Sequence, residues 1–351
     1  MVTPASISEL AHLTRARLIG DGSWTVSGVG AVSIARADQI CFLRTARFAA
    51  VWPRSNGAAA VVSERLGPES LYENDPRKRP LLVVAEADVA LVALLNRFAP
   101  AEENPPSAGI HPSSLVHPSA VIAPSAHIGP GCIVRARARI DEDAVLLAQV
   151  YLGEEAAIGA GSRLHPGVRV LDRCRVGARC TLFAGSVIGS EGFGFARQPD
   201  AHGPVRFPHI GNVVIDDHVD IGANSCVDRA KFGSTTIGAG TKIDNLVQIG
   251  HGCTVGRFCV ICGQCGLAGS VTLGEGVVLG GRVAVTDHVT IGDGAHIGGT
   301  SGVAADVPAG GAYLGSPAEP ATDWKRGYAA MKSLGRLLPQ IRMMVKKSGL
   351  P

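Results

Sequence analysis

The sequence predicts a mainly β protein, in which a left-handed parallel β-helix of hexapeptide repeats follows a small α/β domain and precedes a helical tail. A large aliphatic residue recurs every six residues from Val116 to Ile188. The period resumes at Ile215 and, after a shift of four residues, continues from Ile237 to Val303. A small or branched residue stands four positions after most of these aliphatics, and glycine often follows them directly. Such a short fixed period is typical of a parallel β-helix.

Each hexad is expected to form a short strand and a bend, with its aliphatic side chain pointing inward. Three hexads then close one coil, and successive coils stack at the strand spacing of ~4.8 Å. The glycines suit positions where a side chain would crowd the bend or where φ is positive. The β-helix is predicted over residues 113–315.

The first 100 residues lack the six-residue period and predict a small α/β domain. Short β-rich runs alternate there with helical stretches such as 88–98. The β-rich runs lie at 24–26, 59–62 and 81–84. Residues 101–112 are polar and rich in proline, as expected of a linker.

Two segments interrupt or follow the repeats. Residues 189–212 break the period and carry the run Ser-Glu-Gly-Phe-Gly-Phe-Ala. Loops of this length in compact domains are usually functional. Residues 316–351 are predicted to be helical, with an amphipathic pattern that we expect Pro339 to break or restart.

The tail concentrates positive charge. Such a charge run is commonly just a solvated helix face, and three further interpretations are open. The helix could pack against symmetry mates, dock an acidic protein, or bind nucleic acid. Nucleic acid is the least favoured, because the charge is confined to a short helix without interleaved aromatic residues. The basic residues are Lys325, Arg326, Lys332, Arg336, Arg342, Lys346 and Lys347.

Composition favours a cytoplasmic enzyme. The chain has 45 glycines and only 5% aromatic residues, which suits a solenoid better than a globular core. No run of eighteen apolar residues predicts a membrane span. The first residues lack a charged start followed by an apolar stretch, so no secretory signal is expected.

The cysteines predict neither disulfides nor a metal site. Cys259, Cys262 and Cys265 have ligand-like spacing, but the repeat places two of the three inside the prism. Most other cysteines also fall on the small inward position, where a thiol acts as a compact apolar group.

Outward-facing histidines are the candidates for chemistry. His251 and His288 are 37 residues apart, so both are expected on one side of the prism, roughly 10 Å apart along its axis. An imidazole is suited to act as a general base near neutral pH. Two other interpretations of His251 remain open, a solvated surface histidine and a three-histidine metal site between subunits. Periodicity alone fits the surface interpretation equally for His127, His218 and His296.

Three runs carry a resemblance to a known family. They are Ile188-Gly-Ser-Glu-Gly-Phe-Gly-Phe-Ala196, Ile221-Gly-Ala-Asn-Ser-Cys-Val-Asp-Arg229 and Lys242-Ile-Asp-Asn-Leu-Val-Gln-Ile-Gly-His251. The chain resembles the UDP-3-O-(3-hydroxyacyl)glucosamine N-acyltransferases of lipid A biosynthesis over essentially its whole length. The resemblance implies a homotrimer that moves a 3-hydroxyacyl chain from acyl carrier protein to the 2-amino group of the UDP-linked sugar.

The resemblance also implies roles for individual residues. His251 matches the catalytic base, the backbone N–H of Gly269 matches the oxyanion donor, and His288 matches a histidine that supports substrate binding. Asp244 and Asn245 are implied substrate contacts, although turn residues are an equally open interpretation. No covalent acyl-enzyme, metal or resident cofactor is expected, because phosphopantetheine arrives on the carrier protein.

The regions that flank the repeats resemble the family as well. Phe42 and Phe48 match two aromatic residues of its uridine-binding module, while Thr45 replaces the usual asparagine and Phe48 a tyrosine. Acyl carrier proteins are acidic, so the resemblance implies that the basic tail docks the carrier protein by charge complementarity. The expected docking residues are Lys332, Arg336, Arg342 and Lys346.

Two alternatives from other classes remain. One is a UDP-N-acetylglucosamine O-acyltransferase, which shares the prism and a histidine base. The N-terminal module and the insertion at 189–212 argue against it. The other is a non-catalytic or metal-binding hexapeptide trimer.

Overall fold

The computed structural model describes residues 3–100, 106–197 and 203–348, without the side chains of Arg336 and residues 345–348. Two of the predicted docking side chains, those of Arg336 and Lys346, therefore lie outside the described residues. The chain divides into two compact units, Met1–Pro105 and Pro106–Pro351.

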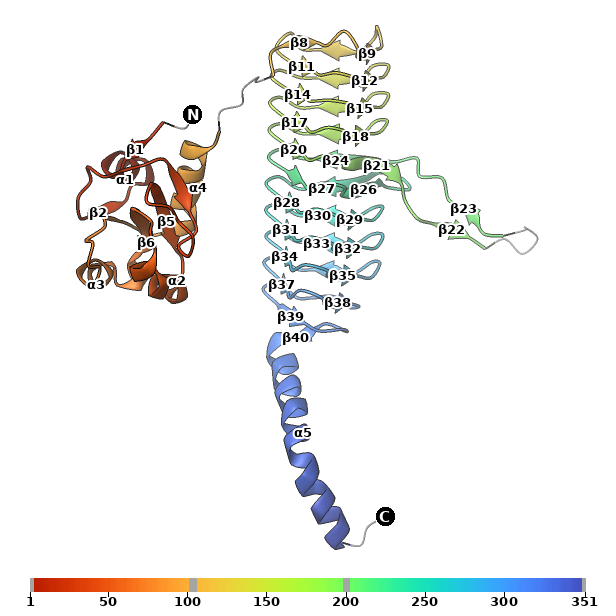
Figure 1. Ribbon diagram of the computed structural model, residues 1–351. Coiled ribbons are helices and arrows are strands. Elements are labelled where there is room, and N and C mark those ends of the chain that lie inside the picture. Colours follow the sequence, from red (N-terminus) through yellow and green to blue (C-terminus); the bar gives the residue numbers. More distant parts are fainter. Residues whose placement is uncertain (1–2, 101–105, 198–202, 349–351) are drawn as a thin grey trace. The chain divides into compact units, whose positions relative to one another are not determined.

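The first unit is an α/β domain built on a five-stranded sheet (Figure 1). The strands run parallel except for the edge strand β2, which is antiparallel to β7. In sheet order they are β2 (Arg17–Ile19), β7 (Leu81–Val84), β6 (Ala59–Ser63), β5 (Gln39–Leu43) and β4 (Gly28–Gly30). A short pair, β1 (Ala5–Ser6) and β3 (Thr25–Val26), lies outside this sheet.

Both faces of this sheet are covered. Val61 packs with buried residues of α1 (Ile7–Thr14) and α4 (Ala87–Phe98). Its neighbour Val62 faces the other way and packs with Trp52, which follows α2. Side chains alternate between faces along a strand, so four consecutive buried apolar residues, as in β6, mark a sheet buried on both sides. The remaining helices are α2 (Ala46–Val51) and α3 (Pro68–Glu73).

The second unit is a left-handed parallel β-helix, as predicted (Figure 1). Its short strands run from β8 (Gly109–Ile110) to β38 (Gly302–Val303). Leaving out the strands β22 and β23 of the insertion, each strand from β8 to β35 pairs with the third strand after it. Leu146, for example, pairs with Leu164 one coil later. Three hexads therefore make one coil, and the stacked coils form three parallel sheets.

The interior of the β-helix is filled as the repeat predicts. The recurring aliphatics, such as Ile140, Leu164 and Ile261, are buried in one continuous core. The small inward positions are buried too, including Cys132 and Cys259. The thiols are thus packing groups, and no cluster of His, Cys, Asp and Glu in the described ranges is arranged to hold a metal ion.

Close stacking explains the glycines that follow the aliphatics. At Gly159 a Cβ atom would lie only 2.5 Å from the carbonyl carbon of Gly177 in the next coil. The positive φ angles fall elsewhere, at corner positions where non-glycine residues such as Arg137 also occur. These glycines are therefore required by the approach of neighbouring coils, because no side chain fits between them.

The insertion projects from the prism as a hairpin (Figure 1). It leaves the coil at β21 (Val187–Glu191), pairs β22 (Phe195–Ala196) with β23 (Val205–Arg206), and returns at β24 (Asn212–Ile215). At its base β21 pairs with β26 (Cys226–Arg229) through a local shift in register.

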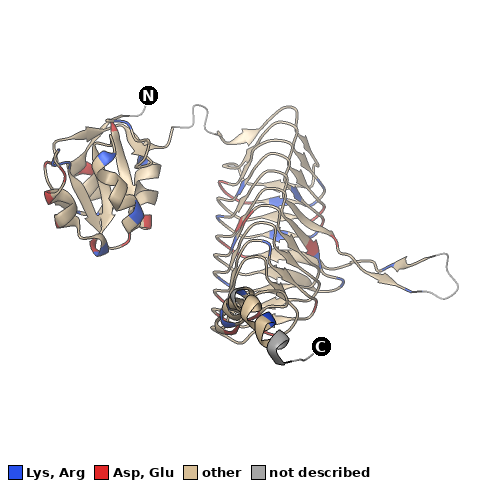
Figure 2. Cartoon of the chain, turned by 60° about the horizontal axis from the view of Figure 1, so that its bottom comes forward, with Lys and Arg blue, Asp and Glu red and all other residues tan. Residues whose placement is uncertain are grey.

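The C-terminal tail is one helix, α5 (Ala321–Ser348), preceded by β39 (Ala312–Leu314) and β40 (Glu319–Pro320). The expectation that Pro339 breaks or restarts this helix is wrong, because Pro339 lies inside α5. Proline removes one backbone hydrogen bond from a helix, but the residues on either side keep the helical path here. Basic residues lie along α5 (Figure 2). Across the described ranges, no helix combines the length and apolar character of a membrane span.

Candidate active site

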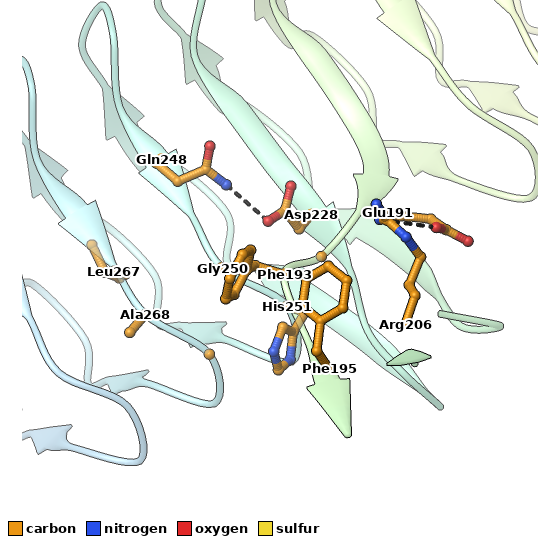
Figure 3. A pocket seen from close by; sticks show the side chains of 12 residues that line it. Glu191, Phe193, Phe195, Arg206, Asp228, Gln248, Gly250, His251, Leu267 and Ala268 are labelled. Carbon is orange, nitrogen blue, oxygen red and sulfur yellow. Dashed lines mark hydrogen bonds and ion pairs between the residues drawn. The ribbon is translucent and has the colours of Figure 1, made fainter. Parts of the chain in front are cut away.

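A cavity of about 600 Å³ lies where the insertion meets the outer face of the prism (Figure 3). Its walls come from the insertion, from β26, and from two consecutive coils that contain β29 (Gln248–Ile249) and β32 (Gly266–Leu267). The lining residues are Glu191, Gly192, Phe193, Phe195, Arg206, Asp228, Gln248, Gly250, His251, Leu267, Ala268 and Gly269.

The repeat itself aims His251 into this cavity. Ile249 is buried inside the prism, and His251 follows two residues later, at the corner where the chain turns outward. The carbonyl of His251 accepts the N–H of Ser270 from the next coil, at 2.9 Å, which ties this corner to its neighbour. The imidazole is partly buried and points toward the insertion (Figure 3).

Two glycines bring backbone against the imidazole. A Cβ atom on Gly269 would lie 2.5 Å from Cε1 and 2.7 Å from Nε2 of His251. On another side, a Cβ atom on Gly192 would lie 2.7 Å from the Cβ atom of His251. Any larger residue at either position would displace the ring, so the site requires glycine for reasons of space.

The backbone N–H of Gly269 is uncapped, although an aspartate caps the equivalent N–H elsewhere along the prism. At the same corner of the prism, Asp172 accepts the N–H of Glu154 at 2.9 Å, and at another corner Asp293 accepts the N–H of Glu275 at 2.8 Å. Asp287 stands one coil after Gly269, but the Gly269 N–H has no acceptor within the described part of the chain. A cavity-lining N–H without a partner is available to a ligand oxygen.

Burial sets the electrostatics of His251. It is the main cause that lowers the pKa of the imidazole below its usual 6.5, followed by the positive charge of Lys231. The Phe193 backbone and the Asp228 carboxylate oppose the shift. The imidazole is therefore the free base at neutral pH, as a proton acceptor requires.

The motif Val227-Asp-Arg229 contributes a carboxylate to the cavity and an arginine that holds the base of the insertion. The sequence alone assigned neither role. Asp228 accepts hydrogen bonds from Ser190 Oγ at 2.6 Å and Gln248 Nε2 at 2.9 Å, and burial raises its pKa. Arg229 is buried, and its guanidinium donates to the carbonyls of Gly189 and Asp172. The only sequence signal was the presence of this motif among the runs that carry the family resemblance.

His288 lies at the same corner of the prism as His251, two coils further on. It follows β35 (Ala284–Val285), and its N–H donates to the carbonyl of Gly269 at 3.1 Å. The side chain is exposed and does not line the cavity. The structure thus places both histidines on one side, as spacing predicts, but brings only His251 into the cavity.

Asp244 and Asn245 lie at a different corner, after β28 (Lys242–Ile243). Asp244 accepts the N–H of Gly263 at 2.9 Å, and Asn245 accepts the N–H of Ala223 at 2.6 Å. These bonds link neighbouring coils and correspond to the turn interpretation. Neither residue lines the cavity of His251, so their contact with substrate stays a prediction.

The remaining predicted residues lie in other parts of the chain. In the first unit, Phe42 of β5 is partly buried and packs against the core, while Phe48 of α2 is 42% exposed. Thr45 precedes α2, and its side chain makes no cap hydrogen bond. On α5, Lys332 and Arg342 are exposed, and the Lys332 ammonium lies 4.8 Å from the centre of the Tyr328 ring.

Comparison with known proteins agrees with the fold. The family model described as bacterial transferase hexapeptide (six repeats) matches residues 234–269, a segment that includes both His251 and Gly269. In structure, the chain is similar to the Arabidopsis UDP-N-acetylglucosamine acyltransferase, with a TM-score of 0.51 and 25% identity. This likeness covers 60% of this chain and 73% of that one.

Full-length relatives are more similar in sequence. UDP-3-O-acylglucosamine N-acyltransferase 1 of Francisella tularensis subsp. holarctica is 37% identical over 97% of both chains. The UDP-3-O-acylglucosamine N-acyltransferase of Anaeromyxobacter sp. (strain Fw109-5) is 41% identical over 97% of this chain and 95% of that relative. With this identity over nearly its whole length, and with a histidine and an open backbone donor in one cavity, the chain belongs to the UDP-3-O-acylglucosamine N-acyltransferase family.

Proposed function

We propose that the protein transfers a 3-hydroxyacyl chain from acyl carrier protein to the 2-amino group of UDP-3-O-(3-hydroxyacyl)glucosamine. The observation that carries this assignment is the pairing of His251 with Gly269. A free-base imidazole and an uncapped backbone N–H line the same cavity, and the glycine Cα lies against the ring. Acyl transfer to an amine needs both a proton acceptor and an oxyanion donor in one site.

The proposed reaction has two chemical steps. The sugar amine attacks the thioester carbonyl while His251 removes its proton, and the Gly269 N–H stabilises the tetrahedral oxyanion. The intermediate then collapses to the amide as the C–S bond breaks, and the proton held on His251 passes to the departing thiolate of the carrier. Protons and electrons balance without a metal or a resident cofactor.

A covalent acyl-cysteine plays no part in this proposal. Burial raises the pKa of the Cys253 thiol to about 11, which leaves almost no thiolate at neutral pH. Burial likewise raises the pKa of Cys259 and Cys265. Cys262 is only partly buried but lies outside the cavity.

The cavity has groups suited to both parts of the substrate. Phe193, Phe195 and Leu267 offer apolar surface for an acyl chain. Asp228 and Gln248, which are hydrogen-bonded to each other, offer polar groups to the sugar. We further propose that His288 contributes to substrate binding, that the exposed face of Phe48 contacts the uracil, and that α5 docks the acidic carrier protein through Lys332 and Arg342.

We propose that the active form is a homotrimer. Exposed apolar side chains on the outer strands of the prism, including Leu115, Val121 and Val260, support contact between columns. We propose that a second column completes the site along the corner that carries His288 and the cavity of His251.

The direct test is mass-spectrometric detection of acyl transfer. The parent and His251→Ala are incubated with a 3-hydroxyacyl carrier protein and UDP-3-O-(3-hydroxyacyl)glucosamine. Product from the parent and at least a hundredfold less from the variant is expected, since a general base contributes roughly 10²–10⁴ in rate. No product from a folded parent would reject this substrate, and UDP-N-acetylglucosamine would be the acceptor to assay next.

A further inference from the structure

His209 is buried for a reason that the reaction above does not explain. It lies on the return arm of the insertion, between β23 and β24, and is only 4% exposed. Among the histidines in the described ranges it alone is buried. Polar side chains are seldom buried unless their hydrogen-bonding groups are satisfied or used.

Only one nitrogen of this ring has a partner. Nδ1 lies 2.9 Å from the carbonyl oxygen of Phe207, to which it donates. Nε2 is buried and has no hydrogen-bond partner within the described residues. The ring centres of His209 and His251 are 5.0 Å apart, with the planes tilted by 58°.

The two imidazoles share one small space. A Cβ atom on Gly192 would lie 2.7 Å from the His251 Cβ atom and 2.8 Å from the His209 Nε2 atom. The unpartnered edge of His209 therefore faces His251 across the space that a side chain at position 192 would fill. The charged groups around this pair are Asp228 and Lys231, with Glu191 and Arg206 on the cavity wall.

We propose that His209 is a positioning residue for His251. Its Nδ1 anchors the ring to the insertion, and the opposite edge of the ring packs against the imidazole of His251. The contact restricts the side-chain rotation of His251 and keeps water from one of its faces, so the base stays aligned and unprotonated. The insertion thereby supports catalysis as well as forming a cavity wall. The inference rests on the proposed role of His251 as the base.

Two variants separate the anchor from the packed edge. His209→Asn keeps a donor close to the place of Nδ1 but removes the half of the ring that faces His251. His209→Phe keeps the ring and loses the anchor. We expect His209→Asn to lower kcat about tenfold or more, with KM for both substrates within about twofold, because misplacing a catalytic group mainly slows the chemical step. We expect kcat of His209→Phe to stay within about threefold of the parent.

The pH profile distinguishes positioning from a structural role. The smaller side chain of His209→Asn admits water to His251. Because burial is what lowers the pKa of His251, this pKa rises, and the fall of kcat/KM at acidic pH begins at a higher pH. His209→Phe keeps the ring buried and leaves this fall near that of the parent. His209→Asn with parental kcat and pH profile would overturn the proposal. So would equal loss in both variants with an unmoved pH profile, because His209 would then serve only the fold of the insertion.

His165 supplies the matched control. Its ring stacks on Phe183 at 4.9 Å on the same prism, but it does not line the cavity. His165→Ala is expected to retain the parental kcat and pH profile. A shift as large as that of His209→Asn would show that any loss of a stacked histidine perturbs the site, and would contradict the specific role of His209.

NMR titration tests the effect of His209 on His251 independently of acyl transfer. In protein labelled with ¹³C at histidine Cε1, the pKa of His251 is measured directly, with His251→Ala used for assignment. A pKa that rises in His209→Asn and not in His209→Phe supports positioning, even if the parent makes no product on the assayed acceptor. An unchanged pKa in both variants overturns it, even if acyl transfer is confirmed.

Discussion

At the scale of single residues, space and burial decide the chemistry of the site. His251 would be an ordinary surface histidine at its corner were it not for the insertion, which buries part of the ring. Position 269 requires glycine, because a side chain there would clash with the imidazole of His251. The same corner leaves the glycine N–H uncapped, so base and oxyanion donor arise from neighbouring coils of one regular scaffold.

The pH dependence of the parent follows from the lowered pKa of His251. The base is active when neutral, so kcat/KM should decline as pH falls through the pKa of the buried ring, with a midpoint below 6.5. A pH series of initial rates measures this limb. An acid limb centred above 6.5 would contradict the assignment of a buried, desolvated base.

Gly269→Ala tests the contact between backbone and ring. The added methyl group would lie within 2.5 Å of Cε1 of His251, so the imidazole must move. We expect a fall in kcat of about a hundredfold, since a displacement of about 1 Å at a catalytic group has effects of this size. Gly266→Ala, where nothing lies within 4 Å of the new methyl, is the control and should retain activity. Equal rates for the two variants would exclude the proposed crowding.

At the scale of elements, the coils and the insertion contribute different parts of the site. The coils fix the positions of Gln248, His251 and Gly269 through a parallel ladder that repeats without variation. The insertion supplies what a regular prism lacks, which is a concave wall. Arg229 secures the base of the insertion by donating to Gly189 and Asp172, and the loop is thereby held over the cavity.

Two glycine substitutions should differ in their effect on the free energy of unfolding, because Gly159 lies between stacked coils and Gly327 lies in α5. Gly159→Ala should lower the free energy of unfolding by about 1–3 kcal/mol, because the methyl would press on the next coil. Gly327→Ala should be neutral or stabilise α5 by up to about 1 kcal/mol, because nothing lies near the added atom in this helix. Thermal or denaturant unfolding measures both, and a neutral Gly159→Ala would contradict the proposed spacing requirement.

Charge reversal on α5 tests the proposed docking helix. The double variant Lys332→Glu with Arg342→Glu should raise the apparent KM for the acyl carrier substrate severalfold at low salt and weaken the salt dependence of the rate. Its kcat at saturating carrier should stay near that of the parent. An unchanged KM at low salt would assign α5 to assembly rather than to docking.

At the scale of the whole molecule, the chain joins an α/β domain, a β-helix and a terminal helix with separate proposed tasks. The α/β domain has its own two-sided core, and the β-helix has another. Exposed apolar residues on the prism are the expected contact surface between copies of the chain. Large exposed apolar surfaces commonly mark such interfaces.

The mass in solution tests the proposed assembly. Light scattering or sedimentation equilibrium should give three times the 36.1 kDa of the chain. Val121→Glu, which places a charge on an exposed strand position, should weaken a trimer if that face is the interface. A monomeric parent with full acyl-transfer activity would reject the homotrimer.

The sequence by itself determined the β-helix, the inward positions of the cysteines and the side on which His251 and His288 lie. A six-residue period fixes all of these, because every coil repeats the same inward and outward pattern. Only the tertiary structure decided what surrounds the outward residues. The burial of His209 and the hydrogen bond between Ser190 and Asp228 depend on an aperiodic insertion folding back on the coils. The uncapped N–H of Gly269 depends on the side-chain contacts of its corner, which the repeat does not specify. Continuity of α5 through Pro339 is likewise decided by the helix as a whole, since local propensity at one residue is a weak constraint.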